Sequence, residues 1–93
     1  MNEEIEKTIR NLTERQAALV KVVLLKGPVP SGASGLSGHG LGRVASSLQE
    51  QGVIEPLGRS GRQKKWTATP DWQKTWSENR KEIEKILDQI IGT

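Results

Sequence analysis

The sequence predicts one α+β domain that ends in a long helix. A chain of 93 residues fits a single domain. Apolar residues recur every three or four positions in several segments, which is the spacing of an amphipathic helix. Ahead of the last of these segments, apolar and polar residues alternate on both sides of a Ser-Gly step, which is typical of a β-hairpin. We therefore divide the chain into a helical extension over 1–12, a domain over 13–69 and a C-terminal helix over 70–93.

The first two helices are predicted from apolar spacing and from a capping sequence. Isoleucines and a leucine over 1–12 stand four and three residues apart, as on one face of a short helix. Thr13 and Gln16 have the spacing of a capping box, in which each side chain accepts a hydrogen bond from a backbone N–H group of the other. An apolar stripe follows, up to Gly27 and a proline that end the helix. We place this helix at 13–26.

Glycine dominates the next segment of the chain. Six glycines lie between residues 27 and 42. Each glycine costs a helix roughly 1 kcal/mol relative to alanine, so any helix over 28–40 is short or absent. His39, the single histidine, lies in this segment, and the chain has no cysteine. We interpret His39 as a loop residue rather than as a metal ligand or a catalytic base.

A helix predicted over 41–51 carries the first candidate functional residues. Four apolar residues from Leu41 to Leu48 share one face of it, and Gly52 is placed to end it. Its opposite face is polar, which suits the base edges of a DNA major groove, with Arg43 reaching a guanine. A helix that simply faces solvent has the same pattern. The candidates for base contact are Arg43, Ser46, Ser47 and Gln49 or Glu50.

Positive charge is highest in the predicted hairpin. Residues 53–68 hold four cations against the single acid Glu55. Cations this close together repel one another, and a phosphate backbone or a minor groove is the simplest partner for them. The alternative is a charged tip that keeps the strand edge from pairing with other chains. The four cations are Arg59, Arg62, Lys64 and Lys65.

The last segment predicts a helix over 70–91 with an apolar seam. Thr69 is placed as its N-cap, Pro70 at its first position and Asp71 in its first turn. The seam residues alternate spacings of four and three, which is typical of a coiled coil and predicts a homodimer with Asn79 as a polar register residue. The alternative is a helix that packs back on its own domain, against the N-terminal isoleucines. The seam consists of Trp72, Trp76, Asn79, Ile83, Ile86 and Ile90.

The order of these elements resembles the winged helix-turn-helix family of DNA-binding domains. The resemblance spans about residues 13–75. It implies a helical core with a two- or three-stranded wing hairpin, in which 41–51 is the recognition helix and 58–65 the wing. The family's second helix would fall within 29–38, which holds three glycines and a proline. The residues that carry the resemblance are Leu48-x-x-x-Gly52-Val53-Ile54, the basic hairpin, and Trp66-x-x-Thr69-Pro70 ahead of the last helix.

Together, the residues and the resemblance predict a small transcriptional regulator that binds double-stranded DNA. A homodimer would bring two recognition helices to successive turns of the major groove, roughly 34 Å apart. The alternative from another class is a protein-interaction module that uses the same scaffold and leaves the wing in solvent. Binding to DNA separates the two hypotheses.

The composition argues against most other functions. Without cysteine there is no disulfide, thiolate metal site or cysteine nucleophile. The glycine-rich segment follows a helix and contains no Gly-Lys-Ser/Thr step, unlike a P-loop or a dinucleotide-binding turn. We therefore expect a non-enzyme without cofactor, metal or small-molecule ligand. The longest apolar run, Val22 to Leu25, is too short to cross a bilayer, and no secretory signal is visible, so we expect a cytoplasmic protein without a membrane partner.

Overall fold

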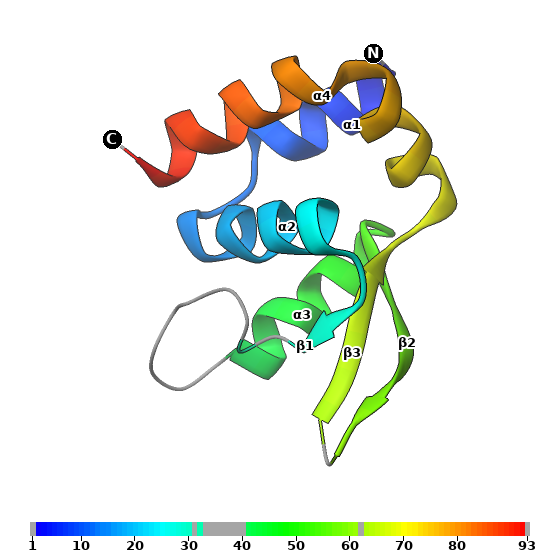
Figure 1. Ribbon diagram of the computed structural model, residues 1–93. Helices are drawn as coiled ribbons and strands as arrows, with labels where there is room; N and C mark the ends of the chain where they lie inside the picture. Colours follow the sequence, from blue (N-terminus) through cyan, green and yellow to red (C-terminus); the bar gives the residue numbers. More distant parts are fainter. Residues whose placement is uncertain (1, 31, 33–40, 62, 93) are drawn as a thin grey trace.

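The computed structural model describes residues 2–30, 32, 41–61 and 63–92. Within these residues the chain forms four helices and a three-stranded antiparallel sheet, which confirms the α+β class (Figure 1). The elements are, in chain order, α1 (Glu3–Arg10), α2 (Glu14–Lys26), β1 (Val29–Pro30), α3 (Leu41–Glu50), β2 (Ile54–Ser60), β3 (Gln63–Ala68) and α4 (Pro70–Ile91).

Helices α1 and α2 both begin at a side chain that accepts hydrogen bonds from the first turn. The Asn2 side-chain oxygen accepts a bond of 2.8 Å from the backbone N–H of Glu4. At α2 the capping box is formed: the Gln16 N–H donates to the Thr13 hydroxyl at 3.2 Å, and the Thr13 N–H donates to the Gln16 side chain at 2.9 Å. Helix α2 ends at Gly27, whose φ of 80° favours glycine. Both predicted helices are confirmed.

The sheet has the order β1-β3-β2, and both strand pairs are antiparallel. Strands β2 and β3 form the predicted hairpin. Strand β1 lies on the other edge of β3, with Val29 opposite Trp66. It occupies the start of the segment to which the resemblance assigned a second helix. Residues 31 and 33–40, which include most of that segment and His39, lie outside the described residues, as does the wing residue Arg62.

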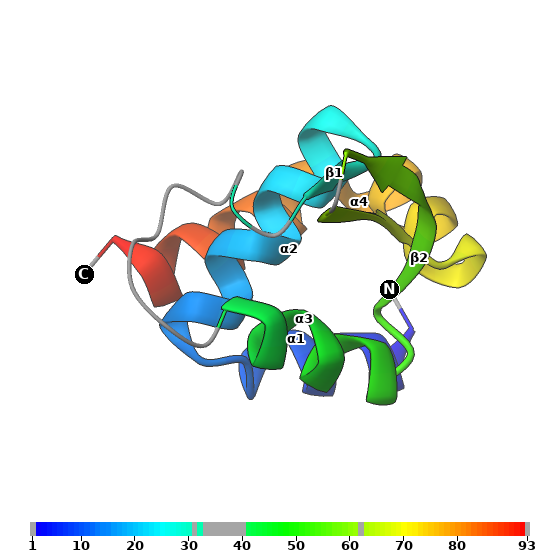
Figure 2. The same ribbon diagram turned by 90° about the horizontal axis from the view of Figure 1, so that it is seen from below.

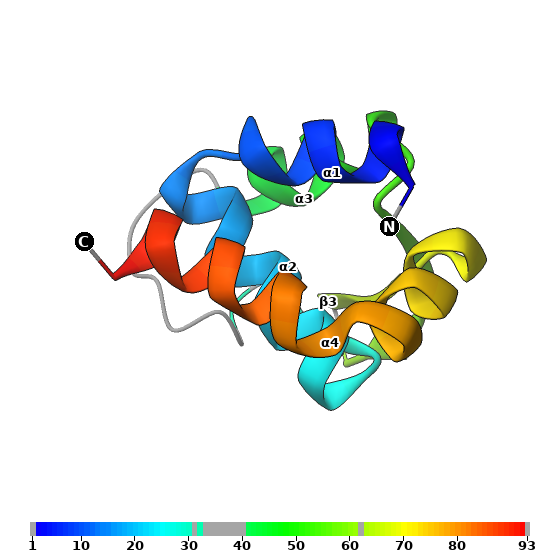
Figure 3. The same cartoon turned by 90° about the horizontal axis from the view of Figure 1, so that it is seen from above.

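Helix α2 is the centre of the molecule and contacts α3, α4, β1 and β3 (Figures 1 and 2). Helices α1 and α4 lie together on one side of it (Figure 3). One hydrophobic core joins the N-terminal extension, the 13–69 segment and the C-terminal helix. Burial of each large side chain stabilises this core by roughly 1.5–3 kcal/mol. The largest fully buried side chains are Ile9, Leu19, Val20, Val23, Leu48, Val53, Ile54, Ile83 and Leu87.

Helix α4 bends at Asn79, whose backbone (φ −131°, ψ 32°) is not helical. The Asn79 side-chain amide donates to the Thr75 carbonyl at 3.2 Å. Arg80, directly after the bend, lies over the Trp76 ring, 5.5 Å from its centroid. The bend separates two helical segments of α4, of which the second runs beside α2 (Figure 3).

The seam of α4 faces its own domain. Trp72, Ile83 and Ile86 are buried within the single chain, where α4 packs against α1 and α2. Trp76, Asn79 and Ile90 are partly exposed. The arrangement found is therefore the one in which the last helix packs back on the N-terminal isoleucines. The homodimer stays a prediction, and half of the residues assigned to it are already used inside the domain.

Thr69 precedes α4 as predicted, but its hydroxyl does not cap the helix. The hydroxyl donates instead to the carbonyl oxygens of Gly52 at 2.8 Å and Val53 at 3.3 Å. The reason is that the Thr69 N–H also donates to Val53, which continues the ladder between β2 and β3 by one residue. The hydroxyl therefore faces the neighbouring strand rather than the first turn of α4.

Candidate nucleic-acid interface

Helix α3 exposes most of the residues predicted to contact bases. Its inner face is anchored by Ala45 and Leu48, neither of which is accessible to solvent. The outer face presents Arg43, Ser46 and Gln49, all exposed. Glu50 is exposed as well. The outer face thus carries one cation and one acid, so its contribution to an interface would be hydrogen bonding rather than net charge.

Ser47 differs from the other candidates because it faces α2. Its hydroxyl oxygen accepts a hydrogen bond of 2.9 Å from the Gln16 side-chain amide. The side-chain amide of Gln51, directly after α3, also approaches it, at 3.4 Å. Ser47 therefore belongs to the contact between α2 and α3. Sequence reasoning assigned Gln16 only to the capping box, because a contact between residues 31 positions apart leaves no mark in a local pattern.

The end of α3 is fixed at the point where the hairpin begins. The N–H of Val53 donates to the Leu48 carbonyl, and the N–H of Gly52 donates to the Gln49 carbonyl, both at 3.0 Å. Gly52 has a φ of 76°. These are the two bonds of a Schellman motif, which satisfies the last carbonyls of a helix and turns the chain sharply. The turn leads directly from α3 into β2.

The hairpin brings its cations together across the two strands. Arg59 and Lys64 are paired residues in the register of β2 and β3, and both are exposed. Lys65 is next to this pair and partly exposed. Like charges directly opposite each other destabilise a sheet. None of these three cations forms an ion pair with any residue that the structure describes.

An irregularity shapes the outer strand of the hairpin. The register shifts between Pro56 and Arg59, where Gly58 has a φ of 75°. A proline and a bulge on an edge strand both hinder pairing with another chain. Leu57, inside this irregular stretch, is 54% exposed, which is high for so large an apolar side chain.

Helix α3 and the tip of the hairpin lie on the same side of the molecule (Figures 1 and 2). Helices α1 and α4 lie on the opposite side (Figure 3). Helix α3 carries the exposed residues Arg43, Ser46 and Gln49, and the hairpin carries the exposed Arg59 and Lys64 and the partly exposed Lys65.

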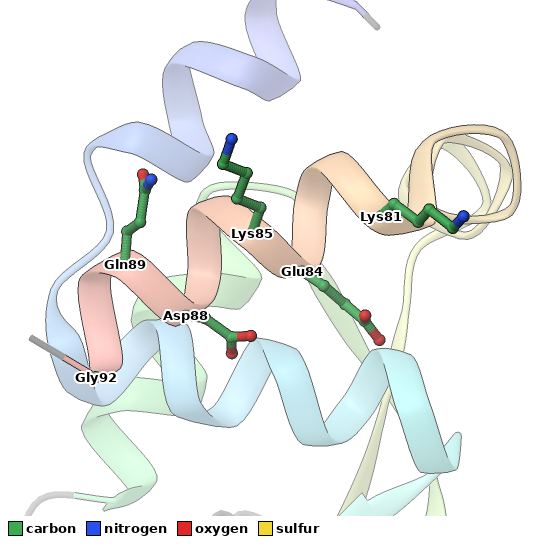
Figure 4. A pocket seen from close by; sticks show the side chains of 6 residues that line it. All are labelled: Lys81, Glu84, Lys85, Asp88, Gln89 and Gly92. Atoms are coloured by element: carbon green, nitrogen blue, oxygen red, sulfur yellow. The ribbon is translucent and has the colours of Figure 1, made fainter.

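A hollow of about 590 Å³ along the end of α4 does not bring reactive groups together. Its side chains diverge, because Glu84 and Asp88 point toward α2 whereas Lys85 and Gln89 point the other way (Figure 4). Asp88 is bound to Lys21, and Glu84 lies 3.6 Å from Arg80. No three acidic or histidine side chains among the described residues are placed to hold a metal ion.

Comparison of the chain with protein-family models, with curated proteins and with solved structures found no match. None of the helices in the described part of the chain combines the length and the apolar content that a bilayer crossing requires.

Proposed function

We propose that the protein is a small transcriptional regulator of the winged-helix type that binds double-stranded DNA. Helix α3 lies in the major groove, where Arg43, Ser46 and Gln49 contact base edges. The hairpin over 58–65 rests on the phosphate backbone or in the minor groove. The protein acts by occupying its site rather than by catalysing a reaction.

The observation that carries the proposal is the cross-strand pair of Arg59 and Lys64. Two exposed cations opposite each other, without an acidic partner among the described residues, weaken the hairpin that holds them. An anionic partner would remove this repulsion, and the phosphates of a duplex are spaced to meet several cations at once. The hairpin that carries this pair lies on the same side of the molecule as α3 (Figures 1 and 2).

Self-association is the second part of the proposal. The partly exposed seam residues Trp76 and Ile90 are the contacts that α4 retains for a second copy. A two-fold dimer would place two α3 helices on successive turns of the major groove. Light scattering at micromolar concentration tests this part alone: a mass of one chain rules out the dimer and leaves DNA binding by a single copy.

The experiment that tests DNA binding compares two triple variants in fluorescence anisotropy with a labelled duplex. The first changes Arg59, Lys64 and Lys65 to Ala. The control changes Lys74, Lys81 and Lys85 to Ala, which removes the same charge from exposed positions on α4. We expect the hairpin variant to lose most of its affinity and the control to keep it. Equal affinity of both variants would contradict the hairpin's role, and a parent protein that does not bind favours the protein-interaction module.

A further inference from the structure

We propose that Gln16 is a positioning residue, which through Ser47 fixes the face that α3 turns to DNA. This inference rests on the proposed function. It also gives Ser47 an indirect role, whereas the sequence suggested that Ser47 contacts a base itself.

Both ends of the Gln16 side-chain amide are bonded. Its oxygen accepts from the Thr13 N–H at 2.9 Å, and its nitrogen donates to the Ser47 hydroxyl oxygen at 2.9 Å. The orientation of the amide is fixed by chemistry, because only its oxygen can accept from an N–H group. The start of α2 and the middle of α3 are therefore joined through a single planar group. We call the bond between Gln16 and Ser47 the α2–α3 latch.

Burial of Ala45 and Leu48 sets which face of α3 turns inward, but it leaves room for small rotations of the helix about its axis. The inner face of α3 consists of small and aliphatic side chains such as Ala45 and Leu48, whose packing is not directional. A hydrogen bond depends on the angle as well as the distance between its atoms. The latch therefore adds a directional constraint to a contact that is otherwise made by apolar packing.

Two adjacent serines, Ser46 and Ser47, show how the bond to Gln16 affects the orientation of α3. Successive residues of a helix are turned by about 100° from one another, since a turn takes 3.6 residues. Ser46 faces solvent and Ser47 faces Gln16. A small rotation of α3 that keeps Ala45 and Leu48 buried would turn Ser47 outward and shift Arg43 and Ser46. The bond from Gln16 to Ser47 opposes this rotation and so fixes the direction in which Arg43 and Ser46 project.

The test is a double-mutant cycle on DNA discrimination. Duplexes that the parent protein enriches from a random pool serve as one probe, and the unselected pool serves as the other. The quantity measured is the discrimination ratio, which is the dissociation constant for the unselected pool divided by that for the enriched duplexes. Ser47→Ala removes the latch, Gln16→Met removes the latch and the capping bond, and the double variant combines them. Thr13→Ala is the control, because it weakens the cap of α2 and leaves Ser47 bonded to Gln16.

We expect Ser47→Ala to lower the discrimination ratio about 3- to 10-fold, the loss expected for one hydrogen bond. Gln16→Met should lower it to a similar extent, and the double variant no further, because both changes break the same bond. Gln16→Glu should retain discrimination, since a carboxylate accepts from both the Thr13 N–H and the Ser47 hydroxyl. Thr13→Ala should leave the ratio unchanged although it lowers the melting temperature. Affinity for the unselected pool, which phosphate contacts dominate, should change little in all variants.

Two results would overturn the positioning role while DNA binding stands. One is a loss in Ser47→Ala that persists in full in the Gln16→Met background, which would mean that Ser47 touches DNA itself. The other is an unchanged ratio in Ser47→Ala. A parent protein that binds the pool without enriching any sequence also refutes the positioning role. A parent that binds no duplex refutes the proposed function, and the positioning role with it.

Discussion

The Thr69 hydroxyl joins two parts of the chain that lie far apart in the sequence. Its bonds to the carbonyls of Gly52 and Val53 connect the start of α4 to the turn between α3 and β2. Neither carbonyl belongs to a helix ladder, and Val53 also accepts the Thr69 N–H at 3.1 Å. The Thr69 side chain thus stabilises the open end of the hairpin, where the chain passes from α3 into β2.

Replacing Thr69 with Val should therefore destabilise the fold without disturbing the cap of α4. Valine keeps the branched shape but loses the donor, and we expect a loss of about 1 kcal/mol in the free energy of unfolding. Thr8→Val is the matched control, because the Thr8 hydroxyl donates to the Glu4 carbonyl of its own helix, at 2.9 Å, in an exposed position. Urea unfolding measures both. Equal stability of the two variants would show that the Thr69 bonds contribute nothing.

At the level of elements, two glycines affect the stability of α3 in opposite ways. Gly52 ends the helix with a φ of 76°, which residues with a Cβ atom seldom adopt. Gly42 lies within the first turn of the helix, is exposed, and has open space where a Cβ atom would be. The first glycine is needed for the turn into β2. The second weakens the helix that carries Arg43.

Alanine at these two positions should change stability in opposite directions. Gly52→Ala should lower the free energy of unfolding by about 1 kcal/mol through backbone strain alone, because no atom lies within 4 Å of the new methyl group. Gly52→Asn should cost less, since asparagine tolerates positive φ. Gly42→Ala should raise the free energy of unfolding by about 0.4–1 kcal/mol. Thermal unfolding of the three variants checks the order, and a destabilising Gly42→Ala would contradict it.

Local patterns predicted the elements well, because their causes are local. The capping box at Thr13 depends on residues three positions apart and is confirmed, as are the two strands of the hairpin. The bend at Asn79 was not predicted, because the seam spacing continues unbroken through it. The bond from Gln16 to Ser47 and the bonds of Thr69 were missed for a related reason. Each depends on which elements meet in space, which no short window of sequence contains.

Across the whole molecule, the hairpin and α4 lie on different sides of α2 (Figure 1). The apolar seam of α4 packs against α1 and α2, whereas Arg59 and Lys64 of the hairpin are exposed. The sequence predicted this basic segment, but the placement of the hairpin on the same side of the molecule as α3 depends on the sheet and on the turn at Gly52 (Figure 1).

This separation predicts how DNA binding depends on salt. If Arg43 and the four cations between 59 and 65 each meet a phosphate, a plot of log affinity against log salt concentration should have a slope of about −4 to −5. Arg59, Lys64 and Lys65 together account for about 3 of these units, so the triple hairpin variant should bind with a slope near −2. The Lys74, Lys81 and Lys85 variant should keep the parent slope, since those side chains lie on α4. A hairpin variant with weaker affinity but an unchanged slope would mean that the cations support the shape of the hairpin rather than contact the duplex.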